Sequence, residues 1–436
     1  MNLRRWLTPG MGVKRWLAVV FLGEMLLALA GALLLRQVYR DVAVEGPLQA
    51  VLWLLTLQFL PYGLRGLILG GLGLVLLVVG FLRVVRVLVV PFAPRDEPLG
   101  EVIYQRRLLA RGPRIVAMGG GTGLSILLRG LKEYTSNLTA VVTVADDGGS
   151  SGKLRAEYGI APTGDIRNCI AALADAEPLM TRLLQYRFPD SDADRGLAGH
   201  SFGNLLIAAM SAVEGDFEEG VRQTNRVLAV RGQVVPASAV PLTLHAELAD
   251  GRRLDGQSAI ARTSGVRRVW LTPEEAPAAE EALAAIRGAD LIVIGPGSLY
   301  TSILPSLLIP AIGAAVHAAA GPVVYVCNVA TQEGETAGYD LADHLAALEA
   351  HAGAGIAGVV LANNDLSARR APGDTSEPVR LDWPPEEARD TLLVLQAIVD
   401  PENAHHHDPH LLAAALLRIH REHATPAPAR RAARTA

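Results

Sequence analysis

The chain has 436 residues, of which 50% are hydrophobic and 19% are charged, and this length allows two or three domains. Its formal net charge of −4 argues against a nucleic-acid binder, because such proteins normally carry a basic surplus. Two cysteines in the whole chain exclude a disulfide framework and a four-cysteine zinc site.

The first part of the chain is apolar enough to enter a membrane. Trp16 to Leu35 contains one charged residue, Glu24, and Gly66 to Leu82 contains none, so each can span a bilayer as a helix. Gly46 to Leu64 is a third uncharged stretch, bracketed by prolines. A signal peptide is the alternative for the first segment, but no small-residue cleavage site follows it. We therefore expect residues 1–92 to form a membrane anchor with two, or three, transmembrane helices.

Basic residues flank the apolar segments and predict their orientation. They precede the first segment and follow or interrupt the last, and the positive-inside rule then favours two spans with both ends in the cytoplasm. Three spans would put one end outside. We expect a multi-pass protein of the cell membrane whose soluble domain lies in the cytoplasm. The residues concerned are Arg4, Arg5, Lys14 and Arg15 at the start and Arg83, Arg86 and Arg95 at the end.

The remainder of the chain has the pattern of an α/β domain. We expect a linker at 93–112, a Rossmann-like domain with a mostly parallel sheet at 113–421 and a disordered tail at 422–436. Turn-rich residues between short β-like runs predict a small antiparallel insertion at about 227–270. The candidate buried strands are Arg114–Met118, Leu138–Ala145, Leu291–Ile294, Val323–Cys327 and Ile356–Leu361.

The first candidate strand runs into a glycine loop, Gly119 to Gly123, that opens a helix. This arrangement places backbone N–H groups and the positive helix end at a phosphate, and glycine lets the main chain approach it closely. Leu124 stands where a dinucleotide fingerprint has its third glycine, and no P-loop lysine follows. The loop therefore predicts a phosphate site or, alternatively, a tight turn without a ligand. The missing glycine disfavours a nicotinamide dehydrogenase.

The second candidate strand ends in an acidic loop that begins with Asp146 and Asp147. A carboxylate here can hold a ribose hydroxyl, whereas paired aspartates can hold a divalent cation beside phosphates. Ser150 and Ser151 add hydroxyl donors. A polar turn that caps a helix is the alternative. Asp147 is the candidate metal ligand, and Mg²⁺ is the one cofactor that this loop would suit.

Two polar clusters follow, each before a helix-like run. Asp165 is a candidate N-cap, and Arg167 and Asn168 would lie in the first turn, where an anionic partner would explain the cation. His200 and Asn204 are four residues apart and would share one helix face. For both clusters a capping or structural role is the alternative.

Two later strands end in further polar loops. Gly295, Gly297 and Ser298 form a second candidate anion cradle, and Asn328 and Thr331 follow the next strand. Four such loops at strand ends converge where open α/β sheets bind ligands. The histidine tract at 405–407 has no chelating spacing, and we interpret it as the solvated start of a helix.

Taken together, the loops resemble the gluconeogenesis factor family of bacteria, a relative of the 2-phospholactate transferases of coenzyme F420 synthesis. The resemblance covers about Arg114 to Leu417 and implies a Rossmann-like fold. The motifs that carry it are MGGGTGLSILLRGLKEYTSNLTAVVTVADDGGSSGKLR, PTGDIRNCIAALAD, GHSFGNLLIAAM, IGPGSLYTSILPSLL and VCNVATQEGET.

The resemblance implies a nucleotide-sugar ligand such as UDP-N-acetylglucosamine and a role in cell shape, wall synthesis and gluconeogenic growth. We expect a non-catalytic regulator that forms a homo-oligomer and works with wall-synthesis proteins; the alternative is a Mg²⁺-dependent transferase of phosphate-linked groups. No catalytic residue is assigned. The expected ligand-binding residues are Gly119, Gly120, Gly121, Thr122, Gly123, Asp146, Asp147, Ser150, Ser151, Asp165, Arg167, Asn168, His200, Asn204, Gly295, Gly297, Ser298, Asn328 and Thr331.

Overall fold

The computed structural model describes residues 107–175, 177–189, 196–368, 376–383 and 391–423, with scattered residues between 21 and 79. The chain divides into two compact units, Met1–Leu108 and Leu109–Ala436. Most of the expected membrane segments, linker and tail lies outside the described residues. Within the described part, no single helix is long and apolar enough to cross a bilayer, whereas one bent pair, Leu299–Leu307 with Pro310–His317 at 82°, meets the criteria of length and composition.

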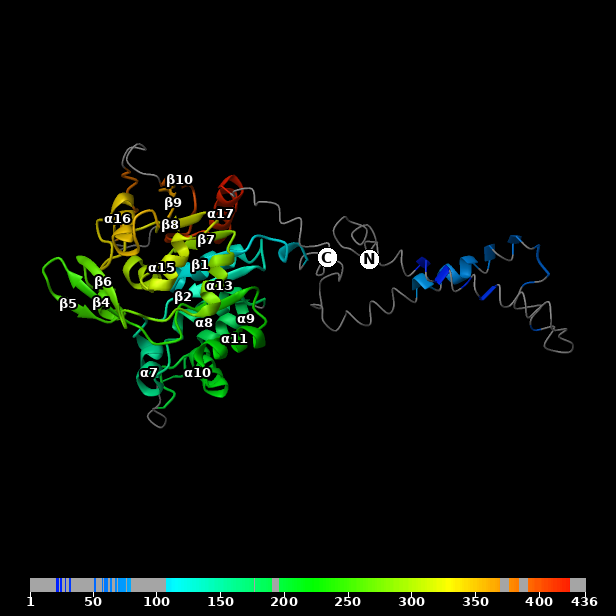
Figure 1. Cartoon of the computed structure of the whole chain (residues 1–436), viewed down its shortest axis with the longest axis horizontal. Coiled ribbons are helices and arrows are strands. Elements are labelled where there is room, and N and C mark those ends of the chain that lie inside the picture. Colours follow the sequence, from blue (N-terminus) through cyan, green and yellow to red (C-terminus); the bar gives the residue numbers. More distant parts are fainter. Residues whose placement is uncertain are drawn as a thin grey trace. The chain divides into compact units, whose positions relative to one another are not determined.

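The second unit is built on a parallel sheet of seven strands in the order β10-β9-β8-β7-β1-β2-β3 (Figure 1). Every residue of β1, β2, β7 and β9 is buried, as expected for short apolar runs covered on both faces. The five predicted strands are confirmed to within a few residues at their ends. The strands are β1 (Ile115–Gly119), β2 (Leu138–Val142), β3 (Gln233–Pro236), β7 (Leu291–Ile294), β8 (Val323–Val326), β9 (Val359–Asn363) and β10 (Leu392–Gln396).

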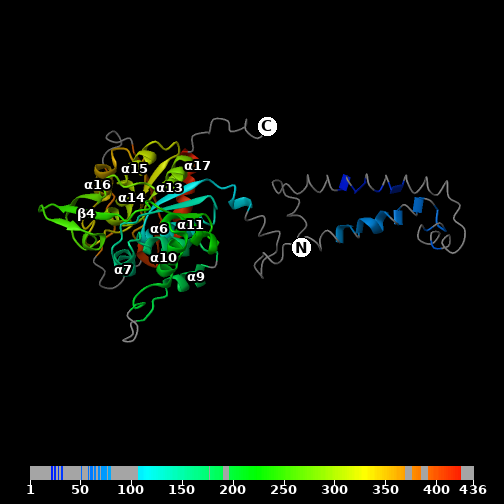
Figure 2. The same cartoon turned by 60° about the horizontal axis from the view of Figure 1, so that its bottom comes forward.

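Helices cover both faces of this sheet (Figures 1 and 2). On one side α6 packs on α8 and α17, and on the other α13, α14 and α15 form a second layer. The chain runs outward from β1 in both directions, which is the doubly wound, Rossmann-like arrangement. The helices are α6 (Gly121–Leu131), α7 (Gly149–Tyr158), α8 (Gly164–Leu173), α9 (Glu177–Gln185), α10 (Phe202–Glu214), α11 (Phe217–Val227), α13 (Glu280–Gly288), the π-helix η2 (Leu299–Ile303), α14 (Leu304–Leu307), α15 (Pro310–His317), α16 (Leu341–Ala352) and α17 (Pro409–His423).

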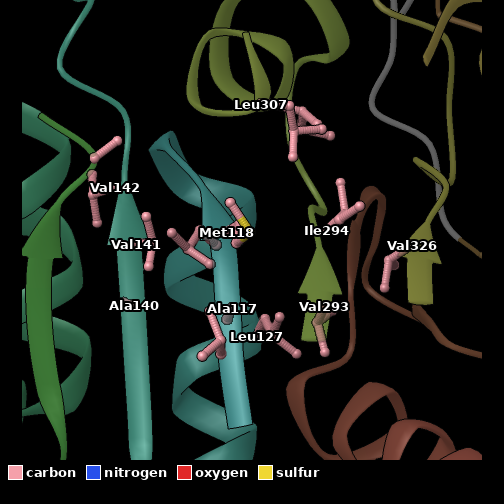
Figure 3. Close-up of a cluster of buried hydrophobic side chains, with 14 of the residues drawn as sticks. Ala117, Met118, Leu127, Ala140, Val141, Val142, Val293, Ile294, Leu307 and Val326 are labelled. Carbon is pink, nitrogen blue, oxygen red and sulfur yellow. The ribbon is translucent and has the colours of Figure 1, made fainter. Parts of the chain in front are cut away.

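The core fixes the central strands in place. Figure 3 shows Met118 of β1, Val141 of β2 and Ile294 of β7 among side chains that the helices contribute, Leu127 from α6 and Leu307 from α14. These side chains are at most 3% exposed, and each fully buried one of this size contributes about 1.5–3 kcal/mol to folding. The carboxyl ends of the central strands therefore form a firmly held edge.

A small antiparallel sheet, in the order β5-β4-β6, confirms the predicted insertion. Its central strand β4 alternates between buried and partly exposed residues. The predicted start at about 227 was wrong, because β3 within that range pairs with β2 and buries Val234 and Val235 in the main sheet. The elements are β4 (Thr243–Leu248), β5 (Arg253–Asp255), α12 (Gln257–Ile260) and β6 (Val266–Thr272).

The prediction that the histidine tract is the solvated start of a helix is wrong, because the tract forms a strand. β12 (Asn403–His407) pairs antiparallel with β11 (Val399–Asp400), and α17 begins only at Pro409. His407 is 4% exposed and its Nε2 lies 3.2 Å from the carbonyl oxygen of Cys327. Burial lowers the pKa of His407 to about 4, so this imidazole is neutral at physiological pH and tolerates burial.

Candidate functional site

The centre of the site is the place where β1 and β7 lie side by side and the chain leaves them in opposite directions. Open α/β sheets bind ligands at this switch point, outside the carboxyl ends of the strands. The glycine loops of the two strands touch here. A Cβ on Gly123 would stand 2.6 Å from the carbonyl oxygen of Pro296, so only glycine allows this approach. The structure thus brings the two predicted anion cradles together.

The first loop opens α6 without a capping side chain at its N-cap position. The N-cap residue is Gly120, which has no side chain to accept a hydrogen bond from the helix, and no acidic residue lies in the first turn. The first N–H groups of a helix have no intrahelical partner, and the positive end of the dipole lies beside them. The N–H of Gly121 is directed to the Asp165 carboxylate. The N–H groups of Thr122 and Gly123, the next two residues of the helix, are therefore the candidate donors to an anion.

An acidic pair, Asp146 and Asp165, lies beside this loop. Asp165 lies in the first turn of α8. The prediction that it is the N-cap is wrong, because Thr163 occupies that position. A Cβ on Gly120 would stand 2.3 Å from Asp165 Oδ2. Burial, and then repulsion from Asp146, raises the pKa of Asp165 to about 6, and burial likewise raises the pKa of Asp146. Two neighbouring carboxyl groups that are partly withdrawn from water in this way are suited to a cation.

Arg167 supplies a buried positive charge two residues further along α8. Its guanidinium donates to Ser201 Oγ at 2.7 Å and to Asn204 Oδ1 at 3.1 Å, both neutral acceptors. Burial lowers its pKa, whereas the charges of Asp165 and Asp146 raise it. Asn168 accepts a third hydrogen bond from the same guanidinium at 3.0 Å. In this structure Arg167 thus balances the acidic pair and fixes α8 against α10.

The serines of the acidic loop join the same network. Ser150 Oγ lies 3.1 Å from His200 Nδ1, and the amide of Asn204 donates to Ser151 Oγ at 3.3 Å. Ser201 is the N-cap of α10, and its side chain accepts from the Asn204 N–H. The predicted pairing of His200 and Asn204 on one helix face is therefore wrong, because His200 precedes the cap, although both residues belong to one buried network.

Asp147 stands apart from this network. It is exposed, and its Oδ1 accepts the N–H of Ser258, which lies in α12 of the antiparallel insertion, at 2.9 Å. A Cβ on Gly256 would collide with the same carboxylate. The two neighbouring aspartates therefore have different surroundings: Asp146 faces the polar network, and Asp147 holds the insertion.

A cavity of about 290 Å³ extends from the glycine loops in the other direction. Asn328 anchors its floor, since its amide donates to the Gly297 carbonyl at 2.9 Å while its Oδ1 accepts the Gly297 N–H at 3.3 Å. The wall that sequence reasoning missed is the histidine strand β12. The lining residues are Gly120, Gly121, Thr122, Gly123, Ile126, Pro296, Gly297, Ser298, Ser302, Asn328, Ala330, Thr331, Gln332, His405, His406 and His407.

Glu335 is a buried carboxylate that sequence reasoning did not single out. Its Oε2 accepts the N–H of Tyr300 at 3.0 Å, and its Oε1 accepts the hydroxyl of Thr301. Burial raises its pKa. These bonds fix the start of η2, which follows the second glycine loop. No local motif marks the residue, because its partners lie 34 and 35 positions away.

A larger hollow of about 390 Å³ lies elsewhere, lined by Ile115 and Leu138 at the starts of β1 and β2 and by Gly232. It is at the amino ends of the strands, away from the polar loops. The carboxyl edge is the better candidate because glycine loops, buried charges and unpaired helix N–H groups meet there.

The sequence profile of a known family, "2-phospho-L-lactate transferase CofD", matches residues 115–398. The chain belongs to the CofD family. A relative from Nostoc sp. is 49% identical over 362 residues, which are 80% of this chain and 76% of its own. The gluconeogenesis factor of Bacillus subtilis is 47% identical over 320 residues, 72% of this chain and 100% of its own.

Solved structures agree with the fold. The crystal structure of a Bacillus halodurans protein superposes with a TM-score of 0.65 at 43% sequence identity, covering 70% of this chain and 100% of that one. The predicted resemblance to gluconeogenesis factors, and through them to 2-phospholactate transferase, is confirmed by these matches.

Proposed function

We propose that this CofD-family protein binds a phosphate-linked metabolite of the nucleotide-sugar class, such as UDP-N-acetylglucosamine, at the carboxyl edge of β1 and β7. The observation that carries the proposal is the meeting of two glycine loops at the start of helix α6, whose N-cap is a glycine. In this proposal, occupancy of the site regulates cell shape, wall synthesis and gluconeogenic growth. The name of the Bacillus subtilis relative supports the last of these roles.

Transfer of a phosphate-linked group with Mg²⁺ is the second candidate, and the name of the family profile favours it. The acidic pair fits the metal. Asp146 and Asp165 have raised pKa values, and the buried hydroxyls of Thr143 and Thr163 have no partner among the described residues. Mg²⁺ is bound by oxygen ligands, commonly one or two carboxylates together with substrate phosphates. No group of three or more acidic, histidine or cysteine ligands occurs in the part of the chain that the structure describes.

In such a transferase these residues would have separate roles. Asp146 and Asp165 would hold Mg²⁺, which when bound would neutralise charge on the phosphate-linked group. The N–H groups of Thr122 and Gly123 would orient the phosphate. Arg167, behind the acidic pair, would keep α8 and its aspartate in position.

The proposals for the cellular location and the oligomeric state of the protein rest on the sequence alone. We propose a membrane-anchored homo-oligomer whose α/β unit faces the cytoplasm and meets wall-synthesis proteins there. The apolar segments within 1–92 and their flanking basic residues support this placement.

The test is calorimetric titration of the full chain in detergent with UDP-N-acetylglucosamine, with and without Mg²⁺, followed by mass spectrometry of the ligand after long incubation. A regulator binds it saturably and returns it unchanged. A transferase hydrolyses it only with Mg²⁺, because water takes the place of the absent acceptor, and Asp165→Asn abolishes the hydrolysis. Absence of binding under both conditions contradicts the proposed ligand class.

A further inference from the structure

The helices that follow the two glycine loops differ in what they offer to an anion. At the start of α6 one N–H is directed to Asp165, and those of Thr122 and Gly123 remain as candidate donors. At the start of η2 the protein itself supplies a negative charge, the buried carboxylate of Glu335. A carboxylate at the first turn neutralises the positive end of a helix. The second helix therefore begins with its anion position already filled.

Glu335 fills this position with bonds from uncharged donors. Its Oε2 accepts the N–H of Tyr300 at 3.0 Å, its Oε1 accepts the hydroxyl of Thr301, and the N–H of Thr301 is also directed to it. The residue is 5% exposed. Burial raises the pKa of Glu335, and these hydrogen bonds oppose the rise.

The second glycine loop is itself largely bonded within the protein. Asn328 pairs with both backbone groups of Gly297, since its Oδ1 accepts the N–H at 3.3 Å and its amide donates to the carbonyl at 2.9 Å. Pro296 has no N–H, and the N–H of Gly295 donates to the Met118 carbonyl at 2.8 Å. The loop therefore shapes the cavity while most of its backbone donors are already used.

The charge of Glu335 belongs to the segment that forms one wall of the cavity. Ser298 and Ser302 line the cavity, and the two residues that bond to Glu335, Tyr300 and Thr301, lie between them in the chain. No Lys or Arg is among the described lining residues to offset this charge. In a partly desolvated site, a like charge several ångströms away disfavours a second anionic group, whereas an uncharged group meets no such repulsion.

We propose that Glu335 is a specificity-determining residue, which favours a ligand whose phosphates are capped by an uncharged group over one that ends in a free phosphate. The phosphates lie at the start of α6, and the uncharged cap lies toward the second loop. This inference rests on the proposed function and deepens it, because it separates a nucleotide sugar from the nucleoside diphosphate of the same base.

The experiment compares the affinities of UDP and UDP-N-acetylglucosamine for the full chain in detergent, by calorimetry at pH 8 with and without Mg²⁺. At this pH the terminal phosphate of UDP carries one more negative charge than a sugar-linked phosphate, because the second pKa of a phosphate monoester is about 6. The native chain should prefer the sugar nucleotide. Glu335→Gln, which removes the charge at equal size, should reduce this preference about three- to tenfold, the effect of one charge several ångströms away in partly screened surroundings.

Three further variants separate charge from structure. Glu335→Asp keeps the charge and should keep the native preference even where both affinities fall. Glu333→Gln removes a carboxylate from the same loop that is exposed to water, and it should leave the preference unchanged. Glu335→Ala leaves room for water at the Tyr300 N–H and is a second charge-free variant, so that either substitution is sufficient if circular dichroism shows it to be folded.

The outcomes separate the two proposals. If the charge-free variants weaken both ligands equally, Glu335 only holds η2 in place, and the specificity proposal is overturned while the proposed function stands. It is also overturned if Glu333→Gln shifts the preference as much, or if the native chain binds UDP as tightly as the sugar nucleotide. If the native chain binds neither compound, the proposed function fails and the specificity proposal with it.

Discussion

The two sides of the first glycine loop differ in charge although they share one sheet edge. On one side, here the acidic side, the partly buried Asp146 and Asp165 and the buried Arg167 lie together with shifted pKa values. On the other side the cavity is lined by hydroxyls, amides and histidines, of which His406 and His407 are neutral. A charged side and a neutral side beside one glycine-loop cradle fit the proposed ligand, which carries charged phosphates and an uncharged sugar.

The difference also shows where the fold gives up stability. Keeping the acidic side charged opposes folding, since ionised groups are taken out of water. The neutral side carries an unpaired glutamine oxygen instead. Costs of this kind are typical of binding sites, and variants that remove them separate stability from function.

The largest effect is expected from Asp165→Asn. The rise in pKa from 3.8 to about 6 corresponds to at most about 3 kcal/mol. Because the folded-state pKa lies above the unfolded value, the destabilisation is absent below about pH 4 and complete above about pH 6. The variant should therefore be more stable than the native chain at pH 8, and the gain should shrink at pH 5.

Urea unfolding at the two pH values measures this gain. Asp147→Asn is the matched control, because that carboxylate is exposed and accepts a single backbone N–H from Ser258. It should not stabilise the protein. If the gain in stability of Asp165→Asn over the native chain is no larger at pH 8 than at pH 5, the acidic side carries no buried charge.

Gly130→Ala should disturb the neutral side through the packing of α6 on α17. Its Cβ would stand 1.9 Å from the carbonyl oxygen of Pro409, the first residue of α17, which lies two positions after the end of the strand that carries the histidines. Overpacking typically costs about 1–3 kcal/mol, and alanine regains about 1 kcal/mol of helix propensity. We expect a net loss of up to about 2 kcal/mol in urea unfolding. Gly358→Ala, with no atom within 4 Å of the added Cβ, is the control; a similar loss there would refute the packing argument.

Gly121→Ala tests the cradle between the two sides. Gly121 has a φ of +63°, and Gly159 at the end of α7 has a φ of +67° with no atom near its added Cβ. Each alanine should cost about 1–2 kcal/mol of stability because of the left-handed backbone. Only Gly121→Ala should weaken binding of UDP, measured by calorimetry. Equal affinities in the two variants would remove the first loop from the site.

The smallest effect on stability is expected from Thr163→Val, which removes a buried hydroxyl that has no partner in the described chain. Because a buried hydroxyl without a partner has an uncompensated desolvation cost, its replacement by an apolar group of the same shape should stabilise the fold by about 1 kcal/mol. The variant should nevertheless bind Mg²⁺ more weakly. Ser306→Ala removes another such hydroxyl, in α14, and should leave Mg²⁺ affinity unchanged. Identical Mg²⁺ titrations of the two variants would argue against a cation at the acidic side.

The sequence predicted what depends on local pattern. Short apolar runs followed by glycine loops predict β1 and β7. Because the two strands are parallel, their carboxyl ends and the loops that follow lie at the same edge of the sheet. The sequence could not predict that the histidine tract forms a strand with a buried end, since His407 is held by a contact with Cys327, 80 positions away. The separation of Asp146 from Asp147 likewise depends on Ser258, 111 positions further along the chain. Long-range contacts of this kind decide which polar residue faces the site.

The central claim is that the carboxyl edge at β1 and β7 binds the phosphates of the ligand. Hydrogen–deuterium exchange of the full chain, with and without saturating UDP-N-acetylglucosamine, tests it most directly. We predict slower exchange in peptides that contain Thr122 and Gly123 and in those that contain Gly297 and Ser298. Protection at Asn137 and Gly232 instead, in the hollow at the amino ends of the strands, would contradict the account.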